Sequence, residues 1–125
     1  MILDTNAISA LLDGDRSLET VLAVADRHHL PAVALGEYRY GLKFSRQKRA
    51  LESLVDELEA ESFPLEVDSA TARHYADIRS DLKTAGRPIP ENDIWIAAMA
   101  RQHRIPIVSR DEHFDRIGGV RRVGW

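Results

Sequence analysis

The segment Ile2-Leu3-Asp4-Thr5-Asn6 decides the fold of this chain, because an apolar pair is followed at once by an acid, a hydroxyl and an amide. A short apolar run bounded by polar residues predicts a buried strand over residues 1–4. Asp4 then lies at the carboxyl end of that strand, where ligands bind in open parallel sheets. Thr5 or Asn6 is expected to cap the next helix while Asp4 faces a ligand, although capping by any of the three also fits the pattern.

Segments with strand and helix patterns alternate along the rest of the chain. Apolar runs predict further strands at residues 32–34, 63–67, 105–108 and 120–123. Apolar residues at helical spacing predict helices at residues 7–12, 18–29, 45–61, 69–85 and 93–100, with another opening at 35–41. Ser17 is the expected N-cap of the second helix, and Pro64 favours an edge position for its strand. The alternation predicts an α/β fold, a three-layer domain with a mainly parallel central sheet of four to five strands flanked by helices.

The length and composition limit the class of protein. The 125 residues correspond to about one domain, expected to span residues 1–125, and the 44% apolar content can fill a single core. The absence of cysteine excludes disulfides, thiolate zinc sites and cysteine nucleophiles. No signal-peptide pattern is visible, and no apolar run approaches the roughly 18 residues needed to cross a bilayer. We therefore expect a cytoplasmic protein that does not enter a membrane.

The charge pattern excludes nucleic-acid binding through general basicity, because the formal net charge is −3. Basic residues nevertheless gather between residues 39 and 49 and again between 116 and 122. Arg39 and Lys43 in the first stretch, and Arg110 beside Asp111, are candidate contacts for nucleic-acid phosphates. A solvated helix face is the plainer interpretation of the first stretch.

Three further acids occupy positions comparable to that of Asp4. Glu37 follows the predicted second strand, Asp111 follows the fourth, and Asp93 stands in the first turn of a helix that leads to the fourth. Because the carboxyl ends of parallel strands meet at one edge, we expect the four acids to converge. Alone, each is more simply a helix-dipole partner or a turn residue, so the prediction rests on the joint pattern.

Carboxylates packed together raise one another's pKa values unless a cation compensates their charge. A set of ligands made only of oxygen atoms suits Mg²⁺ or Mn²⁺ better than zinc. The expected metal ligands, which are also the expected catalytic residues, are Asp4, Glu37, Asp93 and Asp111, supported by Thr5 and Asn6. His113 follows Asp111 closely, but a loop histidine without a catalytic part is the favoured interpretation.

Four segments resemble, in order, the motifs of the PIN-domain ribonucleases, and within that family the VapC-type toxins of bacterial toxin–antitoxin pairs. They are Ile2-Leu3-Asp4-Thr5-Asn6, Gly36-Glu37-Tyr38-Arg39-Tyr40-Gly41, residues 86–98 with Asn92-Asp93, and Val108-Ser109-Arg110-Asp111-Glu112-His113-Phe114. One such motif alone is weak, but four in order cover nearly the whole chain.

This resemblance implies a Mg²⁺- or Mn²⁺-dependent endoribonuclease that hydrolyses RNA phosphodiester bonds as the toxic component of a VapBC-type pair. It also implies a homodimer, and a small cognate antitoxin of the VapB type whose tail occupies the active-site groove. By the match, Asp4, Glu37 and Asp93 form the metal-binding core. Asp111 is the more variable fourth acid, for which Asp115 competes.

Two alternatives stay open within the same fold. One is a PIN nuclease with a housekeeping role in RNA processing. The other is a non-catalytic regulatory domain, against which the presence of all four acids argues. An aspartyl phosphotransferase would want a second aspartate two places after Asp4, where Asn6 stands.

Overall fold

A five-stranded, all-parallel sheet forms the centre of the protein, with the strand order β3-β2-β1-β4-β5. The structure is a computed structural model that describes residues 1–125. The strands are β1 (Ile2–Leu3), β2 (His29–Pro31), β3 (Phe63–Leu65), β4 (Ile107–Val108) and β5 (Arg122–Val123). The helices are α1 (Thr5–Leu12), α2 (Arg16–Leu22), α3 (Ala32–Leu42), α4 (Lys48–Glu61), α5 (Ser69–Thr84), α6 (Glu91–His103) and the 3₁₀ helix η1 (Glu112–Arg116).

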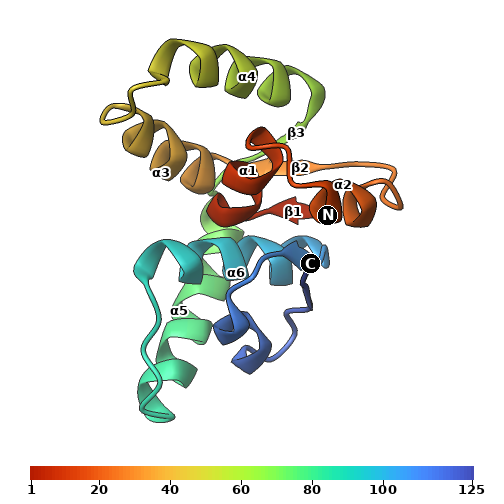
Figure 1. Cartoon of the computed structure of the whole chain (residues 1–125). Helices are drawn as coiled ribbons and strands as arrows, with labels where there is room; N and C mark the ends of the chain where they lie inside the picture. The colour runs from red at the N-terminus through yellow and green to blue at the C-terminus, as the bar shows by residue number, and fades with distance from the viewer.

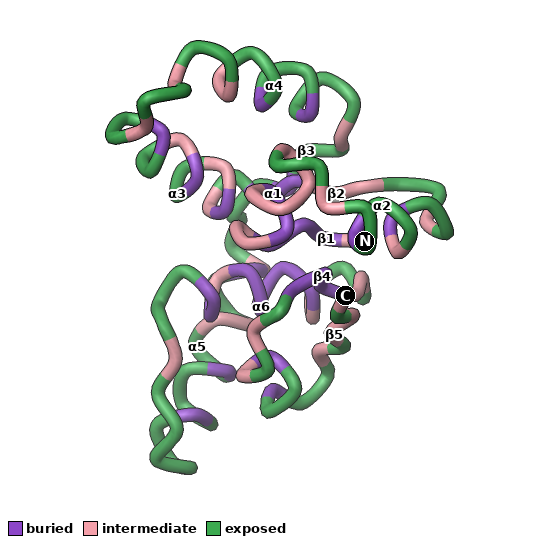
Figure 2. The backbone as a smooth tube through the Cα atoms, viewed as in Figure 1, coloured by how far each residue is buried: buried purple, intermediate pink, exposed green.

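The sheet lies between two groups of helices, which confirms the expected three-layer α/β fold. Helices α3 and α4 lie on one side of the strands and α5 and α6 on the other (Figure 1). The central strand β1 pairs with β2 on one edge and with β4 on the other, and Ile2 and Leu3 are completely buried. Figure 2 shows that the buried residues follow β1, β4 and the length of α6. Twenty-five buried hydrophobic residues form one continuous core around these elements.

The second strand differs from the prediction. Residues 32–34 form the first turn of α3, whereas β2 begins at His29, at the end of a segment predicted to be helical. Helix α2 ends earlier, at Leu22. Pro31 ends the strand, and its φ of −64° is already that of a helix start, so the alanine-rich segment after it becomes helical. The strand is so short that it leaves no alternating pattern in the sequence.

Two helix starts also differ from the prediction. Asp15, not Ser17, caps α2, because its carboxylate accepts hydrogen bonds from the amides of Ser17 and Leu18 at 3.0 and 3.3 Å. Helix α4 begins at Lys48 rather than at residue 45. The expected edge position of Pro64 is confirmed, because β3 lies at the edge of the sheet. Asp68 caps α5 through a capping box with Thr71.

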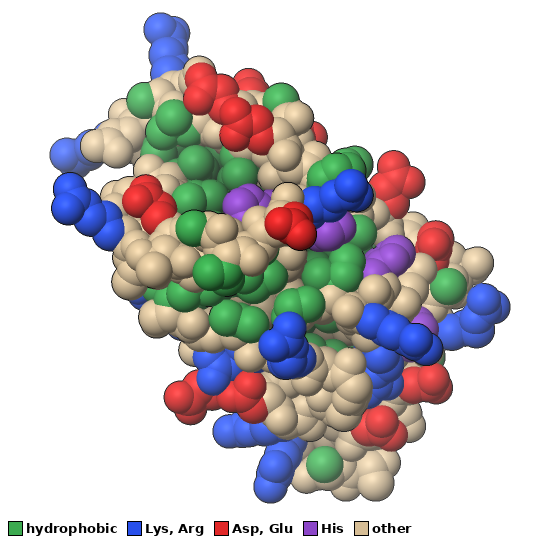
Figure 3. All heavy atoms as spheres, turned by 90° about the vertical axis from the view of Figure 1, so that its right-hand side faces the viewer, with side chains coloured by type: hydrophobic (Ala, Val, Ile, Leu, Met, Phe, Trp, Pro, Cys, Tyr) green, Lys and Arg blue, Asp and Glu red, His purple; other side chains and the backbone are tan.

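Acidic and basic side chains are mixed over the face that Figure 3 shows, and they do not gather into a single basic patch. This mixing agrees with the small negative net charge of −3. None of the helices combines the length and the apolar character that crossing a bilayer requires.

The central strand should carry a large share of the stability. We expect Leu3→Ala to lower the free energy of unfolding by about 2–5 kcal/mol, because Leu3 is fully buried between two neighbouring strands. Leu54→Ala, the same substitution at a side chain that is 40% exposed, should cost well under half as much. Urea unfolding followed by circular dichroism measures both, and equal losses would contradict the assignment of β1 as the centre of the core.

Candidate active site

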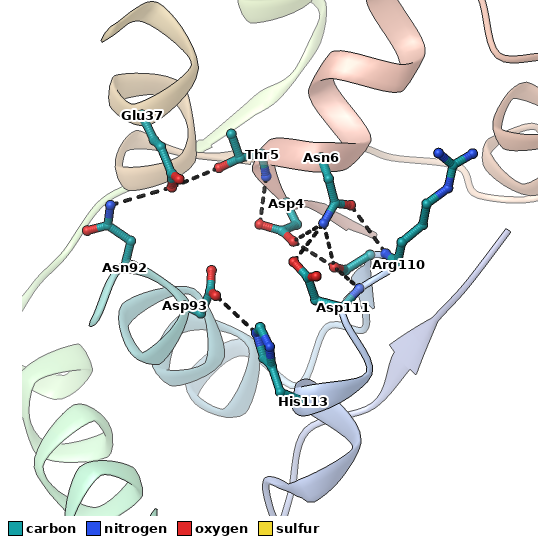
Figure 4. A network of polar contacts seen from close by, with 10 residues as sticks. Asp4, Thr5, Asn6, Glu37, Asn92, Asp93, Arg110, Asp111 and His113 are labelled. Carbon is teal, nitrogen blue, oxygen red and sulfur yellow. Dashed lines mark hydrogen bonds and ion pairs between the residues drawn. The ribbon is translucent and has the colours of Figure 1, made fainter. Parts of the chain in front are cut away.

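The structure brings Asp4, Glu37, Asp93 and Asp111 to one groove of about 1130 Å³. Asp4 follows β1 and Asp111 follows the neighbouring strand β4, while Asp93 projects from the first turn of α6 (Figure 4). Glu37 reaches the groove from the middle of α3 rather than from just beyond a strand. The other lining residues are Thr5, Asn6, Ser9, Asp13, Tyr38, Tyr40, Gly41, Leu42, Leu51, Pro90, Glu91, Asn92 and His113.

Asp4 is both the N-cap of α1 and a lining residue of the groove. Its Oδ1 accepts a hydrogen bond from the Thr5 amide at 2.6 Å, so Asp4 itself provides the cap that was expected of Thr5 or Asn6. Its Oδ2 accepts from Ser109 Oγ at 2.6 Å and from Asn6 Nδ2 at 3.0 Å. Burial raises the pKa of Asp4, the hydrogen bonds from Ser109 and Thr5 lower it, and the charges of Asp111 and Glu37 raise it further.

Asn6 joins the two strand-end acids. Its Nδ2 lies 3.0 Å from Asp4 Oδ2 and 2.8 Å from Asp111 Oδ2, and it also contacts Ser109 Oγ at 3.1 Å (Figure 4). Its Oδ1 accepts a hydrogen bond from the Arg110 amide at 3.2 Å. A neutral amide thus holds two carboxylates in place without cancelling their charge.

Glu37 is held by two neutral donors of its own. Thr5 Oγ1 donates to Glu37 Oε2 at 3.1 Å, and Asn92 Nδ2 approaches the same oxygen at 3.4 Å. The hydroxyl of Thr5 therefore connects α1 to α3, on the opposite side of the groove from Asp111 (Figure 4).

Three site residues were not identified from the sequence, namely Asn92, Ser109 and His113. Ser109 is completely buried between Asp4 and Asp111. Its Oγ donates to Asp4 Oδ2 and accepts a hydrogen bond from the Asp111 amide at 3.0 Å. The 3₁₀ helix η1 turns His113 back, so that its Nε2 lies 3.0 Å from Asp93 Oδ2. All three lie within two residues of a predicted site acid, inside the third and fourth motif segments, and that proximity was their signal in the sequence.

The three basic residues predicted to contact RNA do not line the groove. Arg39 pairs with Asp56 at 2.8 Å and with Glu59 at 2.7 Å, and so ties α3 to α4. Arg110 pairs with Asp15 at 2.6 Å. Lys43 is exposed at the end of α3 and makes no ion pair. The ion pairs of Arg39 and Arg110 therefore support a structural role for these two residues and not a contact with phosphates.

Asp115 lies outside the groove. Its carboxylate accepts two hydrogen bonds from Arg122, at 3.0 Å from Nε and 2.7 Å from Nη2, and this pairing lowers its pKa. Of the two candidates for the fourth acid, the geometry therefore favours Asp111, whose Oδ2 lies 2.8 Å from Asn6 Nδ2.

The groove is acidic, and of its acids only Glu91 pairs with an arginine, Arg79 at 3.0 Å. Its charged lining is Asp4, Asp13, Glu37, Glu91, Asp93 and Asp111, with His113 but without lysine or arginine. Burial, followed by the charges of Asp4, Asp111 and Glu37, raises the pKa of Asp93 to about 7. Asp93, Asp111 and His113 each offer one donor atom within 4.8 Å of the others. Closely spaced, uncompensated carboxylates are the arrangement that a hard divalent cation stabilises, so the residues present fit such an ion.

The chain is similar to known proteins over nearly its whole length. Residues 1–120 match the PIN domain family. The chain is 34% identical to "Ribonuclease VapC5" of Mycobacterium tuberculosis, over 98% of this chain and 90% of that protein. The solved structure of VapBC-5 from M. tuberculosis, a member of the VapBC family of toxin–antitoxin systems, has a TM-score of 0.79 at 30% identity and covers 99% of this chain and 97% of its own. VapBC2 of Rickettsia felis, solved with a promoter DNA fragment, shares the fold with a TM-score of 0.90 at 22% identity, over 99% of this chain and 97% of its own.

Without a cation, the acid cluster should make stability depend on pH. The pKa of Asp93 is higher in the folded protein, about 7, than its ordinary value of 3.8. Its contribution to stability is therefore complete below pH 3.8 and is lost as the pH rises through about 7. In EDTA, we therefore expect the thermal midpoint to fall between pH 5 and pH 8. At pH 8, Asp93→Asn should raise it by about 3 °C or more, because it removes one repelling charge.

Thermal scans with and without Mg²⁺ measure this effect. Mg²⁺ should raise the midpoint of the wild-type protein at pH 8 and should have less effect on Asp93→Asn. Asp115→Asn is the matched control, because that carboxylate is already stabilised by Arg122 and should gain nothing on neutralisation. A lower midpoint for Asp93→Asn at pH 8 would show that repulsion does not govern the cluster.

Proposed function

The chain belongs to the PIN-domain family, and on that premise we propose that it is a metal-dependent endoribonuclease acting as the toxic component of a VapBC-type toxin–antitoxin pair. The observation that carries the proposal is the meeting of Asp4, Glu37, Asp93 and Asp111 in one groove whose lining has no lysine or arginine. The similarity to a ribonuclease over 98% of the chain supports hydrolysis of RNA as the reaction.

The proposed cofactor is Mg²⁺ or Mn²⁺, held by Asp4, Glu37, Asp93 and Asp111. Such an ion, when bound, activates water and neutralises charge that develops on a phosphodiester. The hydrogen bonds of the protein hold these acids in place. Asp4 is fixed by three hydrogen bonds, and Asn6 fixes Asp111 relative to it. His113 contacts Asp93 from the side of η1 and is the one titratable nitrogen in the groove.

The surroundings of the groove favour RNA and a protein partner as ligands. The groove has a volume of about 1130 Å³, and Tyr40 in its lining is 67% exposed and available to stack on a base. Its acidic lining also suits a basic tail of a cognate VapB-type antitoxin. The solved relative VapBC-5, of a toxin–antitoxin family, supports such a partner. A homodimer is proposed as well, because the family resemblance implies one.

Removal of single carboxylates should abolish cleavage while leaving the fold intact. We expect Asp4→Asn and Asp93→Asn each to slow RNA cleavage by about 100-fold or more, because each removes charge stabilisation at nearly constant shape. Asp111→Asn should reduce it as well, whereas Asp115→Asn should retain most of the activity. Purified variants are assayed with Mg²⁺, with Mn²⁺ and with EDTA, and circular dichroism verifies folding.

Undiminished cleavage by both Asp4→Asn and Asp93→Asn would rule out the assigned site. Sequencing of new RNA 5′ ends after induced expression identifies the cut RNA. Co-purification with the product of a short adjacent reading frame, reversed by neutralising the groove acids, distinguishes the toxin from a housekeeping nuclease.

A further inference from the structure

Arg110 is turned away from the groove and held by Asp15 and Trp125. Its Nη2 donates to Asp15 Oδ2 at 2.6 Å, and its guanidinium carbon lies 4.5 Å from the centre of the Trp125 ring. The indole Nε1 of Trp125 donates to the same Asp15 oxygen at 3.1 Å. Asp15 is fixed in turn, because its other oxygen caps α2. These three side chains form a closed set of contacts, called here the Arg110 clamp.

The clamp acts on the segment that carries two of the site residues. Arg110 stands between Ser109, which donates to Asp4, and Asp111, which contacts Asn6. The last residues of the sequence hold this segment from its other side. The Ser109 amide donates to the Val123 carbonyl at 3.1 Å, and Arg122 Nη1 donates to the Ser109 carbonyl at 3.0 Å. Residues 109–111 are therefore fixed at both the backbone and the Arg110 side chain.

The clamp contributes little to global stability. The Arg110 side chain is 55% exposed, and exposed ion pairs stabilise proteins only weakly. Stacking of the Arg110 guanidinium on the half-buried indole of Trp125 adds a similarly small amount. The clamp can still matter for metal binding, because a metal site binds its ion tightly only when its ligands are held in place before the ion arrives. A contact that is weak for the fold can thus be important for the site.

We propose that Asp15, Arg110 and Trp125 are positioning residues that fix the segment 109–111 and so set the affinity of the acid cluster for its divalent cation. The proposal rests on the proposed function in taking the four acids as cation ligands. None of the three residues lines the groove, and Arg110 acts through its neighbours on either side.

The test measures Mn²⁺ binding to metal-free protein by isothermal titration calorimetry. Arg110→Met and Trp125→Ala should each raise the dissociation constant about 3- to 10-fold, the cost of ordering a freed loop or side chain at the moment of binding. For Arg110→Met, electrostatics alone predicts the opposite sign, because removing a nearby positive charge should tighten cation binding. Unchanged or tighter Mn²⁺ binding by Arg110→Met would overturn the proposal.

A second measurement does not involve the metal. Hydrogen–deuterium exchange of the peptide containing residues 109–114 should become faster in Arg110→Met and Trp125→Ala, with EDTA present throughout. Arg110→Lys, which keeps the charge beside Asp15, should restore part of the protection. Asp56→Asn is the matched control, because it breaks an exposed arginine pair far from the segment and should leave exchange and Mn²⁺ binding unchanged.

Activity then separates a positioning effect from a loss of fold. The Mg²⁺ concentration for half-maximal RNA cleavage should rise in the two clamp variants, while the rate at saturating Mg²⁺ stays within about twofold of wild type. A loss of rate that Mg²⁺ does not restore would contradict the proposal. If the wild-type protein cleaves no RNA but the Mn²⁺ and exchange results hold, the proposed function fails and the clamp stands.

Discussion

Repulsion among carboxylates at one edge of the sheet is the constraint on which the rest of the site depends. The neighbours that hold these acids are nearly all neutral donors, namely the Thr5 hydroxyl and amide, the Asn6 and Asn92 side chains and the Ser109 hydroxyl. Neutral donors fix a carboxylate without cancelling its charge. A lysine or arginine in their place would satisfy the same oxygens and remove the need for a bound cation. The choice of neutral donors therefore keeps the negative charge of the cluster available.

Three arginines near the site are paired with acids that do not belong to the cluster. Arg39 is bound by Asp56 and Glu59, Arg110 by Asp15, and Arg122 by Asp115. Each of these arginines is directed to an acid outside the cluster. The arrangement explains how a chain with a basic segment and a net charge of −3 can still present a groove without lysine or arginine. The charge of the groove is thus set by which acids the arginines pair with, and not by the net charge of the whole chain.

The sequence was informative wherever a site residue lies near the end of a strand or the start of a helix that the sequence also predicts. Asp4 and Asp111 follow apolar strands, and Asp93 opens an apolar helix, so their meeting could be predicted from parallel-sheet topology alone. The position of β2 could not, because a strand of three residues ending in Pro31 has no periodicity to detect. The pairing of Arg39 depends on where α4 packs, and the orientation of His113 depends on the turn of η1. Such contacts are set by tertiary structure and leave no local pattern.

The two sides of the site come from opposite ends of the chain. Ile2 pairs with Ile107, and the contacts of Asp4 with Ser109 and of Asn6 with Asp111 each join residues 105 positions apart. Contacts this distant in sequence form late in folding, because the loop between them must close first. A ribosome that synthesises this protein releases Asp4 early, but Asp4 has no partner across the groove until β4 and the residues after it have emerged. The nascent chain therefore has no assembled site until the residues up to Asp111 have been synthesised.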